Sequence, residues 1–241
     1  MSATGGAAPT GWTDSAQAWI DDLAGEHEFG RRHVLDPVML ARVRGRGFSR
    51  ALDVGCGEGR FCRMMAAEGI AATGIDPTEP LLAEARARDP GGDYRIGRAE
   101  RLDFDDDGFD LVVSYLSLID IADIRAAIGE MARVLRPGGS LLIANLNPFN
   151  TAAIVGGGAA PDQRNAIRGY LNERSGWVAW RGIRIRNWHR PMTTYMALLL
   201  GAGLELRFFV EPAASGGPSA QQQRYDDAPW FHVMEWRKPA D

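Results

Sequence analysis

The sequence has few of the residues that build metal centres and disulfide frameworks. Its 241 residues include two cysteines and four histidines. Cys56 and Cys62 lie close together in one segment, so the chain lacks the ligand spacing of a zinc site. The acidic run DFDDDG, residues 103–108, lacks the alternating ligand order of a calcium loop. We therefore expect no metal site, and we expect a reduced, cytoplasmic protein.

Basic charge and long apolar runs are also scarce. The formal net charge is −4 and Lys238 is the only lysine, so no general basic field is present to attract nucleic acid. The N-terminal segment MSATGGAAPTG lacks the charged and apolar regions of a secretory signal, and the apolar run YMALLLGAGL is too short to cross a bilayer. We expect neither a nucleic-acid partner nor a membrane span. The oligomeric state stays open, a homodimer included.

Short apolar segments alternate with helical ones from residue 50 onward. The expected strands are ALDV, AATGID, DYRIG, FDLVVSYL and SLLIANL. This alternation predicts a parallel sheet covered on both faces, with a ligand site at the carboxyl ends of its strands. We predict a disordered tail over 1–13 and a single domain over 14–241. Within it, 14–46 is a helical N-terminal segment, 147–190 an insertion with two short strands, and 211–223 a mobile loop.

Glycines alternate with other residues where the first of these strands ends. In LDVGCGEG, Gly55, Gly57 and Gly59 would let the backbone pass close beneath a ligand, because no Cβ is in the way. The spacing differs from the G-x-G-x-x-G of dinucleotide sites, and the carboxylates of Asp53 and Glu58 would repel a pyrophosphate. The loop therefore favours a ligand with a cationic amino group. A tight turn without a ligand is the alternative.

A carboxylate also ends the second strand, in GIDP. At this position Asp76 can accept hydrogen bonds from both hydroxyls of a ribose. Alternatively, Asp76 caps the helix that follows, because Pro77 and Thr78 come next. The two roles are compatible.

Four segments in order, LDVGCGEGR, GIDP, GRAERLDFDDDGFDLVVSYLSLIDI and EMARVLRPGGSLLIA, resemble the motifs of class I S-adenosylmethionine-dependent methyltransferases. The resemblance covers about residues 50–146 and is strongest to the small-molecule branch that includes the quinone-biosynthesis enzymes. It implies an α/β, Rossmann-like, doubly wound fold with a mostly parallel seven-stranded sheet. The last strand, WFHVMEWR, would be antiparallel, and a helical lid would precede the sheet. S-adenosylmethionine would be the cofactor, S-adenosylhomocysteine the product, and a small aromatic or partly apolar molecule the acceptor.

The resemblance also assigns cofactor contacts. Beneath the methionine part and its amino group it places Asp53, Gly55, Cys56 and Gly57. Around the ribose and adenine it places Asp76, Pro77, Ala99 and Glu100. Near the methyl group it places Ser114 and Tyr115, at the end of the fourth strand.

The chain departs from the family pattern at two positions. The family commonly has an aspartate that accepts from the adenine amino group where this chain has Arg98, which can only donate. Glu100 or a backbone carbonyl would then have to replace it. Relatives often carry a histidine at the position of Asp120. That residue either forms a polar wall of the substrate pocket or, with Asp123, caps the next helix.

Residues outside the sheet motifs would complete the site. His189 borders the insertion that covers the substrate pocket in this family, so it leads the four histidines as a candidate general base, with a structural role as the alternative. Tyr115 and Asp120 are the other catalytic candidates. Trp19 or Phe29 could place an aromatic edge beside the sulfonium. Arg31 or Arg32 could pair with the methionine carboxylate, or else belong to a solvated helix flank.

Three other functions compete with small-molecule methyl transfer. A methyltransferase for tRNA or protein would need a basic face or a recognition domain, and neither is evident in the sequence. A non-catalytic module that only binds S-adenosylmethionine would keep the same motifs. A nicotinamide-dependent dehydrogenase is disfavoured by the glycine spacing and by Glu58.

Overall fold

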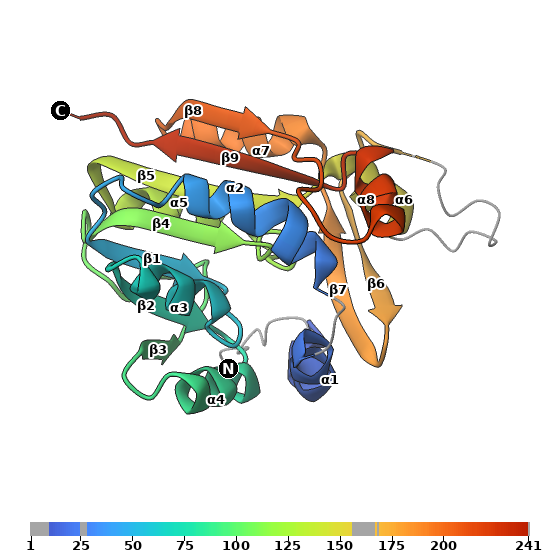
Figure 1. Cartoon of the computed structure of the whole chain (residues 1–241). Helices are drawn as coiled ribbons and strands as arrows, with labels where there is room; N and C mark the ends of the chain where they lie inside the picture. Colours follow the sequence, from blue (N-terminus) through green and yellow to red (C-terminus); the bar gives the residue numbers. More distant parts are fainter. Residues whose placement is uncertain (1–9, 25–27, 156–166, 168, 241) are drawn as a thin grey trace, which may run out of the picture.

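The computed structural model describes residues 10–24, 28–155, 167 and 169–240 (Figure 1). Its main sheet has seven strands in the order β3-β2-β1-β4-β5-β9-β8. The strands of this sheet are β1 (Arg50–Val54), β2 (Ala71–Asp76), β3 (Asp93–Ile96), β4 (Phe109–Tyr115), β5 (Leu135–Leu146), β8 (Glu205–Val210) and β9 (Phe231–Arg237). The helices are α1 (Trp12–Ala24), a π-helix η1 (Gly30–Leu35), α2 (Asp36–Ala41), α3 (Arg60–Ala67), α4 (Glu79–Arg88), α5 (Ile124–Val134), α6 (Pro148–Ile154), α7 (Met192–Gly201) and α8 (Ser219–Asp226).

The sheet is parallel except at β9. This strand lies between β5 and β8 and is antiparallel to both, with a register from Ser140↔Arg237 to Leu146↔Phe231 on the β5 side. The prediction of a mostly parallel, seven-stranded α/β sheet with an antiparallel last strand is therefore confirmed.

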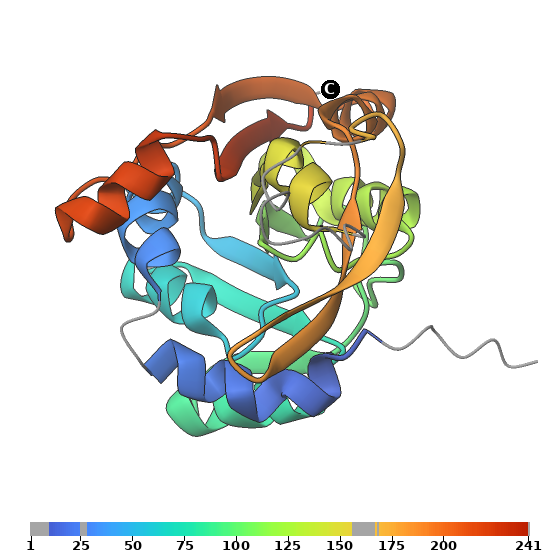
Figure 2. The ribbon, with the colours of Figure 1, turned by 90° about the vertical axis from the view of Figure 1, so that its right-hand side faces the viewer.

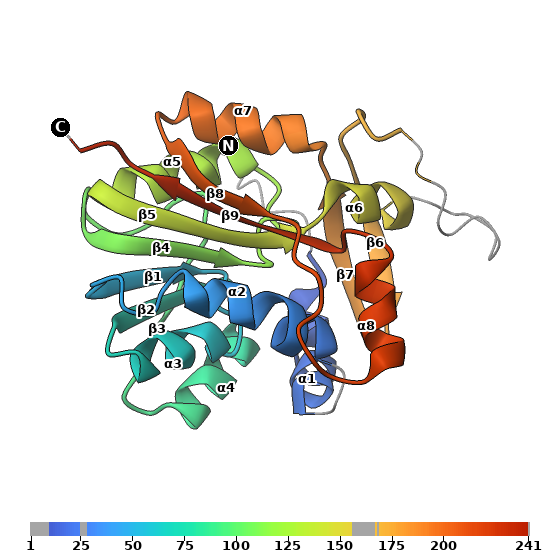
Figure 3. The same ribbon diagram turned by 45° about the horizontal axis from the view of Figure 1, so that its top comes forward.

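Helices cover the sheet on both faces (Figures 1 and 3). On one face α2 and α3 contribute Met39, Phe61 and Met65 to the core. On the other face α5 and α7 contribute Ile128 and Leu199. Full burial of such side chains stabilises the fold by about 1.5–3 kcal/mol each. The two faces of the sheet are thus covered by packed helices. The carboxyl ends of the parallel strands are not covered by these helices.

Two segments distant in sequence lie together beyond those strand ends. They are α1 and an antiparallel hairpin of β6 (Arg174–Trp180) and β7 (Ile183–His189), which cross each other in Figure 2. The Arg186 N–H donates to the Thr10 carbonyl at 2.8 Å, and the Arg184 N–H donates to the Ser15 hydroxyl at 3.0 Å. We call α1 and this hairpin the cover. No helix among the described residues has the length and apolar character needed to cross a membrane.

Two sequence predictions about irregular segments are corrected here. The predicted tail 1–13 is too long, because Thr10 and Gly11 are ordered against β7 and Trp12 begins α1; residues 1–9 lie outside the described residues. The predicted loop 211–223 runs into helix α8, whose Tyr225 stacks on Phe29 with ring centroids 5.3 Å apart. The glycine run at 156–158, expected to let the insertion move, also lies outside the described residues.

Candidate active site

The glycine loop after β1 has the conformation that its glycines allow. Gly55, Gly57 and Gly59 have φ values of +80°, +55° and +75°, a backbone region that residues with a side chain rarely adopt. A Cβ on Gly55 would come within 2.4 Å of the Ser117 Cβ, whereas one on Gly57 would meet nothing within 4 Å. Gly55 is therefore required by packing, while Gly57 leaves space above the loop where a ligand can approach the backbone.

Asp53 lies beside this loop with an unused acceptor. Its side chain is 1 % exposed, and in the described part of the chain Oδ1 has no hydrogen-bond partner. Oδ2 lies 3.5 Å from the Cys62 Sγ. Burial, together with the nearby carboxyls of Asp76 and Glu58, raises the pKa of Asp53 to about 7, although the contact with Cys62 acts in the opposite direction. A buried acceptor of this kind fits an ammonium group, which would supply both a donor and a compensating charge.

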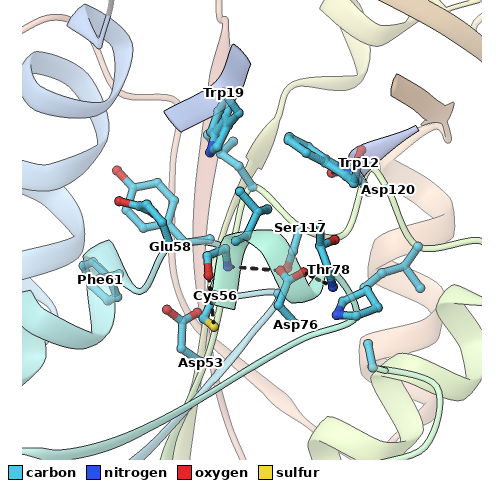
Figure 4. Close-up of a pocket in the computed structure, with 18 of the residues that line it drawn as sticks. Trp12, Trp19, Asp53, Cys56, Glu58, Phe61, Asp76, Thr78, Ser117 and Asp120 are labelled. Carbon is cyan, nitrogen blue, oxygen red and sulfur yellow. Dashed lines mark hydrogen bonds between the residues drawn. The ribbon is translucent and has the colours of Figure 1, made fainter. Parts of the chain in front are cut away.

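Asp76 joins the ends of β1 and β2. Its Oδ2 accepts from the Gly57 N–H at 3.0 Å, and its Oδ1 accepts from the Thr78 N–H at 2.8 Å (Figure 4). Burial raises the pKa of Asp76, and these two bonds oppose that effect. The residue that caps α4 is Thr78, not Asp76. Asp76 therefore fixes the glycine loop, and each of its oxygens retains lone-pair capacity for a further donor in the cavity.

Most of the predicted cofactor residues meet in one cavity. Those that line it are Trp19, Arg31, Asp53, Gly55, Cys56, Gly57, Asp76, Pro77, Ala99, Glu100 and Tyr115. Arg98 also lines it and donates to Glu100 Oε1 at 3.0 Å, so the departure from the family pattern is an ion pair at the cavity wall. Three predicted residues are not in the wall. Ser114 is fully buried with its hydroxyl 2.7 Å from the Ser117 hydroxyl, and Phe29 packs on Tyr225. Arg32, the alternative to Arg31, pairs with Glu28 at 3.6 Å.

Several wall residues were not predicted from the sequence. They are Thr10, Trp12, Leu23, Glu58, Arg60, Phe61, Thr78, Leu81, Gly97, Leu116, Ser117 and Ile121. Thr78 directly follows Pro77, and Leu116 and Ser117 are the next two residues after Tyr115, so motif proximity could have indicated these three. Trp12 and Thr10 had no such signal, because they precede the expected start of the first helix.

Tyr115 is tied to a charged cluster. Its hydroxyl donates to Asp36 Oδ1 at 2.7 Å, and Arg60 Nη1 donates to the same oxygen at 2.9 Å. Burial, together with the negative charge of Asp36, raises the pKa of Tyr115 well above its usual value. Tyr115 is thus a neutral wall residue that orients its ring edge against Phe61, and it is poorly suited to accept a proton.

A second cavity of about 640 Å³ adjoins the first. We call the two the cofactor cavity and the acceptor cavity. The walls of the acceptor cavity include a group of aromatic residues, Trp177, Trp180, Tyr225, Trp230 and Phe231. Residues that border both cavities are Trp12, Trp19, Leu23, Arg31, Leu116 and Asp120. The two cavities therefore share a wall that comes mainly from α1 and the segment after β4.

Asp120 is the carboxylate in that shared wall. Trp12 Nε1 donates to its Oδ2 at 3.0 Å, and Asn187 Nδ2 donates to its Oδ1 at 2.5 Å. Burial raises the pKa of Asp120 to about 8, although these two donors act in the opposite direction. The alternative of a helix cap is wrong for Asp120. Asp123 alone caps α5, accepting from the Ala126 N–H at 3.0 Å.

The structure does not support the catalytic role predicted for His189. The residue is fully buried and lines neither cavity. Its Nε2 lies 2.8 Å from the Tyr170 carbonyl, which can only accept, so Nε2 carries the proton. Its Nδ1 lies 2.7 Å from the Thr151 hydroxyl, and burial lowers its pKa. His189 therefore joins β7 to α6 and contacts neither cavity.

Comparison with known proteins agrees with this geometry. Residues 52–143 match a family model described as a methyltransferase domain. A malonyl-[acyl-carrier protein] O-methyltransferase of Salmonella typhimurium is 30 % identical over 185 residues, which are 74 % of this chain and 73 % of that protein. A ubiquinone biosynthesis O-methyltransferase of Sinorhizobium medicae is 34 % identical over 140 residues, 56 % of this chain and 53 % of that protein. The crystal structure of an S-adenosylmethionine-dependent methyltransferase from Mesorhizobium loti superimposes with a TM-score of 0.70 at 28 % identity, covering 83 % of this chain and 96 % of that one.

The sheet order, the glycine loop and the carboxylate at the end of β2 define a Rossmann-like protein with a ligand site at the strand ends. With the matches above, the chain belongs to the S-adenosylmethionine-dependent methyltransferases. The predictions of the family, of an enzyme that transfers methyl groups and of its cofactor are thereby confirmed.

Proposed function

We propose that the protein methylates a small molecule with an aromatic or partly apolar body, bound in the acceptor cavity. The observation that carries this proposal is the shared wall, because Trp12, Trp19 and Asp120 border both cavities. A molecule in one cavity would therefore lie next to a molecule in the other, with these shared residues in contact with both.

Bound S-adenosylmethionine supplies an electrophilic methyl group on a sulfonium. The chain's own residues then have to hold the acceptor atom in line with the S–CH₃ bond and exclude water. Alignment of this kind can lower a barrier by about 7–11 kcal/mol. Toward the cofactor, we propose that Asp53 holds the amino group, Asp76 the ribose hydroxyls, and Arg31 the methionine carboxylate.

On the acceptor side we propose that Asp120 receives a proton. Its pKa of about 8 lies near neutrality, the range in which a carboxylate is an effective general base. Such a base would accelerate transfer by about 10²–10⁴-fold if the acceptor atom carries a proton that it loses. An acceptor hydroxyl meets this condition, and both relatives named above are O-methyltransferases. We therefore favour a hydroxyl or other protonated oxygen as the methyl acceptor.

Two measurements test this function. S-adenosylhomocysteine at about 100 times its dissociation constant should stabilise the protein by about 2.7 kcal/mol, whereas NAD should have no effect. A screen of phenols, carboxylic acids and amines with methyl-labelled cofactor should then give labelled product from an oxygen acceptor. A thermal shift with NAD and none with S-adenosylhomocysteine would contradict cofactor use. Binding of S-adenosylhomocysteine with transfer only to tRNA or protein would favour the macromolecular alternative, and binding with no transfer would favour a non-catalytic module.

We also propose that the enzyme acts in the cytoplasm, as Cys56 and Cys62 are free thiols. Sedimentation at several protein concentrations would decide between a monomer and the homodimer that the sequence left open.

A further inference from the structure

Three segments that are distant in sequence meet at the Asp120 carboxylate. Asp120 lies in the loop after β4, Trp12 is the first residue of α1, and Asn187 is in β7. The two donors are separated from Asp120 by 108 and 67 residues. Each occupies a different oxygen of the carboxylate, so its orientation is fixed from two sides (Figure 4 shows Trp12 and Asp120).

The hairpin and the residue that follows it, Arg190, also hold the loop that carries Asp120. The Trp188 N–H donates to the Ile119 carbonyl at 2.7 Å, and the guanidinium of Arg190, which is 1 % exposed, donates to the carbonyls of Ile121 at 2.7 Å and Ala122 at 2.9 Å. Asn187 is therefore carried by a strand that is already anchored to this loop.

Trp12, in contrast, depends on the docking of α1. This helix joins the hairpin through Thr10 and Ser15, as described above, and Gly11 is packed so closely that a Cβ there would lie 2.3 Å from the Arg184 carbonyl oxygen. The indole N–H of Trp12 reaches Asp120 from the start of this docked helix.

We propose that Trp12 and Asn187 are positioning residues that hold the Asp120 carboxylate at the junction of the two cavities, so that α1 must be docked on the hairpin before this carboxylate is in place. The proposal rests on the function proposed above. It assigns the N-terminal helix a role beyond covering the cofactor, because the helix supplies one of the two hydrogen bonds that orient an acceptor-side group.

The charges around Asp120 set the direction of the expected effect. Both donors stabilise its ionised form, as does the guanidinium of Arg31, while the Asp76 carboxyl destabilises it. The acceptor cavity also carries Asp22 and Glu28, balanced by Arg181 and Arg224. Removal of either donor should therefore make the carboxylate harder to ionise.

The first experiment measures turnover against pH in three variants. Trp12→Phe keeps the aromatic bulk and removes the N–H, and Asn187→Leu keeps the approximate volume and removes the amide. Each of these two substitutions should shift the midpoint of the rising limb of the kcat–pH profile to higher pH, by about one unit. Trp188→Phe is the matched control. It lies next to Asn187 outside both cavities and retains its backbone bond, so its limb should keep the wild-type midpoint.

The second experiment needs no turnover, so it remains decisive if the proposed function fails. In the cofactor-free protein, the ¹⁵N-indole resonance of Trp12, assigned by its loss in Trp12→Phe, should titrate with a midpoint near that of Asp120. Asp120→Asn should abolish this titration, and the Trp188 indole should not titrate in either protein. A Trp12 resonance that is flat across the range, or unchanged in Asp120→Asn, would overturn the positioning role. Titration without any detectable methyl transfer would support the hydrogen bond and count against the proposed function alone.

Discussion

Replacement of Asp76 tests the cofactor site most directly. In Asp76→Ala, the Thr78 N–H loses its acceptor in a buried environment, and the Gly57 N–H loses its acceptor at a half-buried position beside the cavity. An unsatisfied buried N–H costs about 1–3 kcal/mol, so we expect the cofactor-free variant to lose at least about 1 kcal/mol of stability through Thr78. For a protein of this size, that loss lowers Tm by at least about 2–4 °C.

The same substitution should weaken cofactor binding. Two charge-assisted bonds to ribose hydroxyls would be lost, each worth about 1.5–3 kcal/mol, so the affinity for S-adenosylhomocysteine should fall at least about tenfold. Isothermal titration measures the affinity and melting curves measure the stability. Asp93→Ala is the control. Asp93 accepts from Thr73 and Arg95 and lies outside the cavity wall, so its loss should leave affinity unchanged.

The two readouts separate two roles of Asp76. A lower Tm with affinity within a factor of about two of the wild type would mean that Asp76 only supports the glycine loop. That result would refute its assignment to the ribose.

Three further substitutions give distinct outcomes. Asp120→Asn should lower kcat and remove the rise in turnover as pH passes through about 8, because the wild-type carboxyl must lose its proton to act as a base; affinity for S-adenosylhomocysteine should stay within about threefold, and an unaltered pH profile would exclude the base role. Asp53→Asn should weaken cofactor binding yet stabilise the free protein increasingly from pH 4 to pH 8. The folded wild type keeps its Asp53 proton up to about pH 7, while the unfolded chain releases it near pH 3.8. The stability linked to that proton is therefore complete below pH 3.8 and lost as pH rises through about 7. The same difference in Tm between Asp53→Asn and the wild type at pH 4 and at pH 8 would contradict the burial argument. His189→Ala should lower Tm by leaving the Thr151 hydroxyl and Tyr170 carbonyl without their partner, while the midpoint of the pH–rate profile stays at the wild-type value; a shifted midpoint would return His189 to the acceptor site.

The sheet and the cofactor loop were predictable because their signals are local. The hydrophobic periodicity of the sequence and its turn-forming residues predict β1, β2 and β4. Gly55 and Asp76 occupy fixed positions at the ends of the first two of these strands. Parallel strands bring their carboxyl ends to one edge, so residues that end separate motifs meet without any knowledge of long-range contacts.

The acceptor side was less predictable because it depends on contacts between distant segments. No local pattern indicates that Trp12 bonds Asp120, and residue 12 falls within the tail predicted over 1–13. His189 failed for a related reason, since a strand residue has two possible sides and only the packing of α6 determines which one it faces. Ser114 and Ser117, three residues apart, show the same ambiguity: Ser114 is fully buried, whereas Ser117 is a lining residue of the cavity.

The shared wall has a consequence for protein engineering. Residues that border both cavities cannot be exchanged to accept new substrates without also altering the pocket for the methyl donor. Trp177, Trp180 and Trp230 border the acceptor cavity but not the cofactor cavity. Libraries directed at acceptor choice are therefore best confined to such positions. Residues that contact only the acceptor thus come from the hairpin and the segment before β9. They are separate from the shared wall, whose residues contact both the acceptor and the methyl donor.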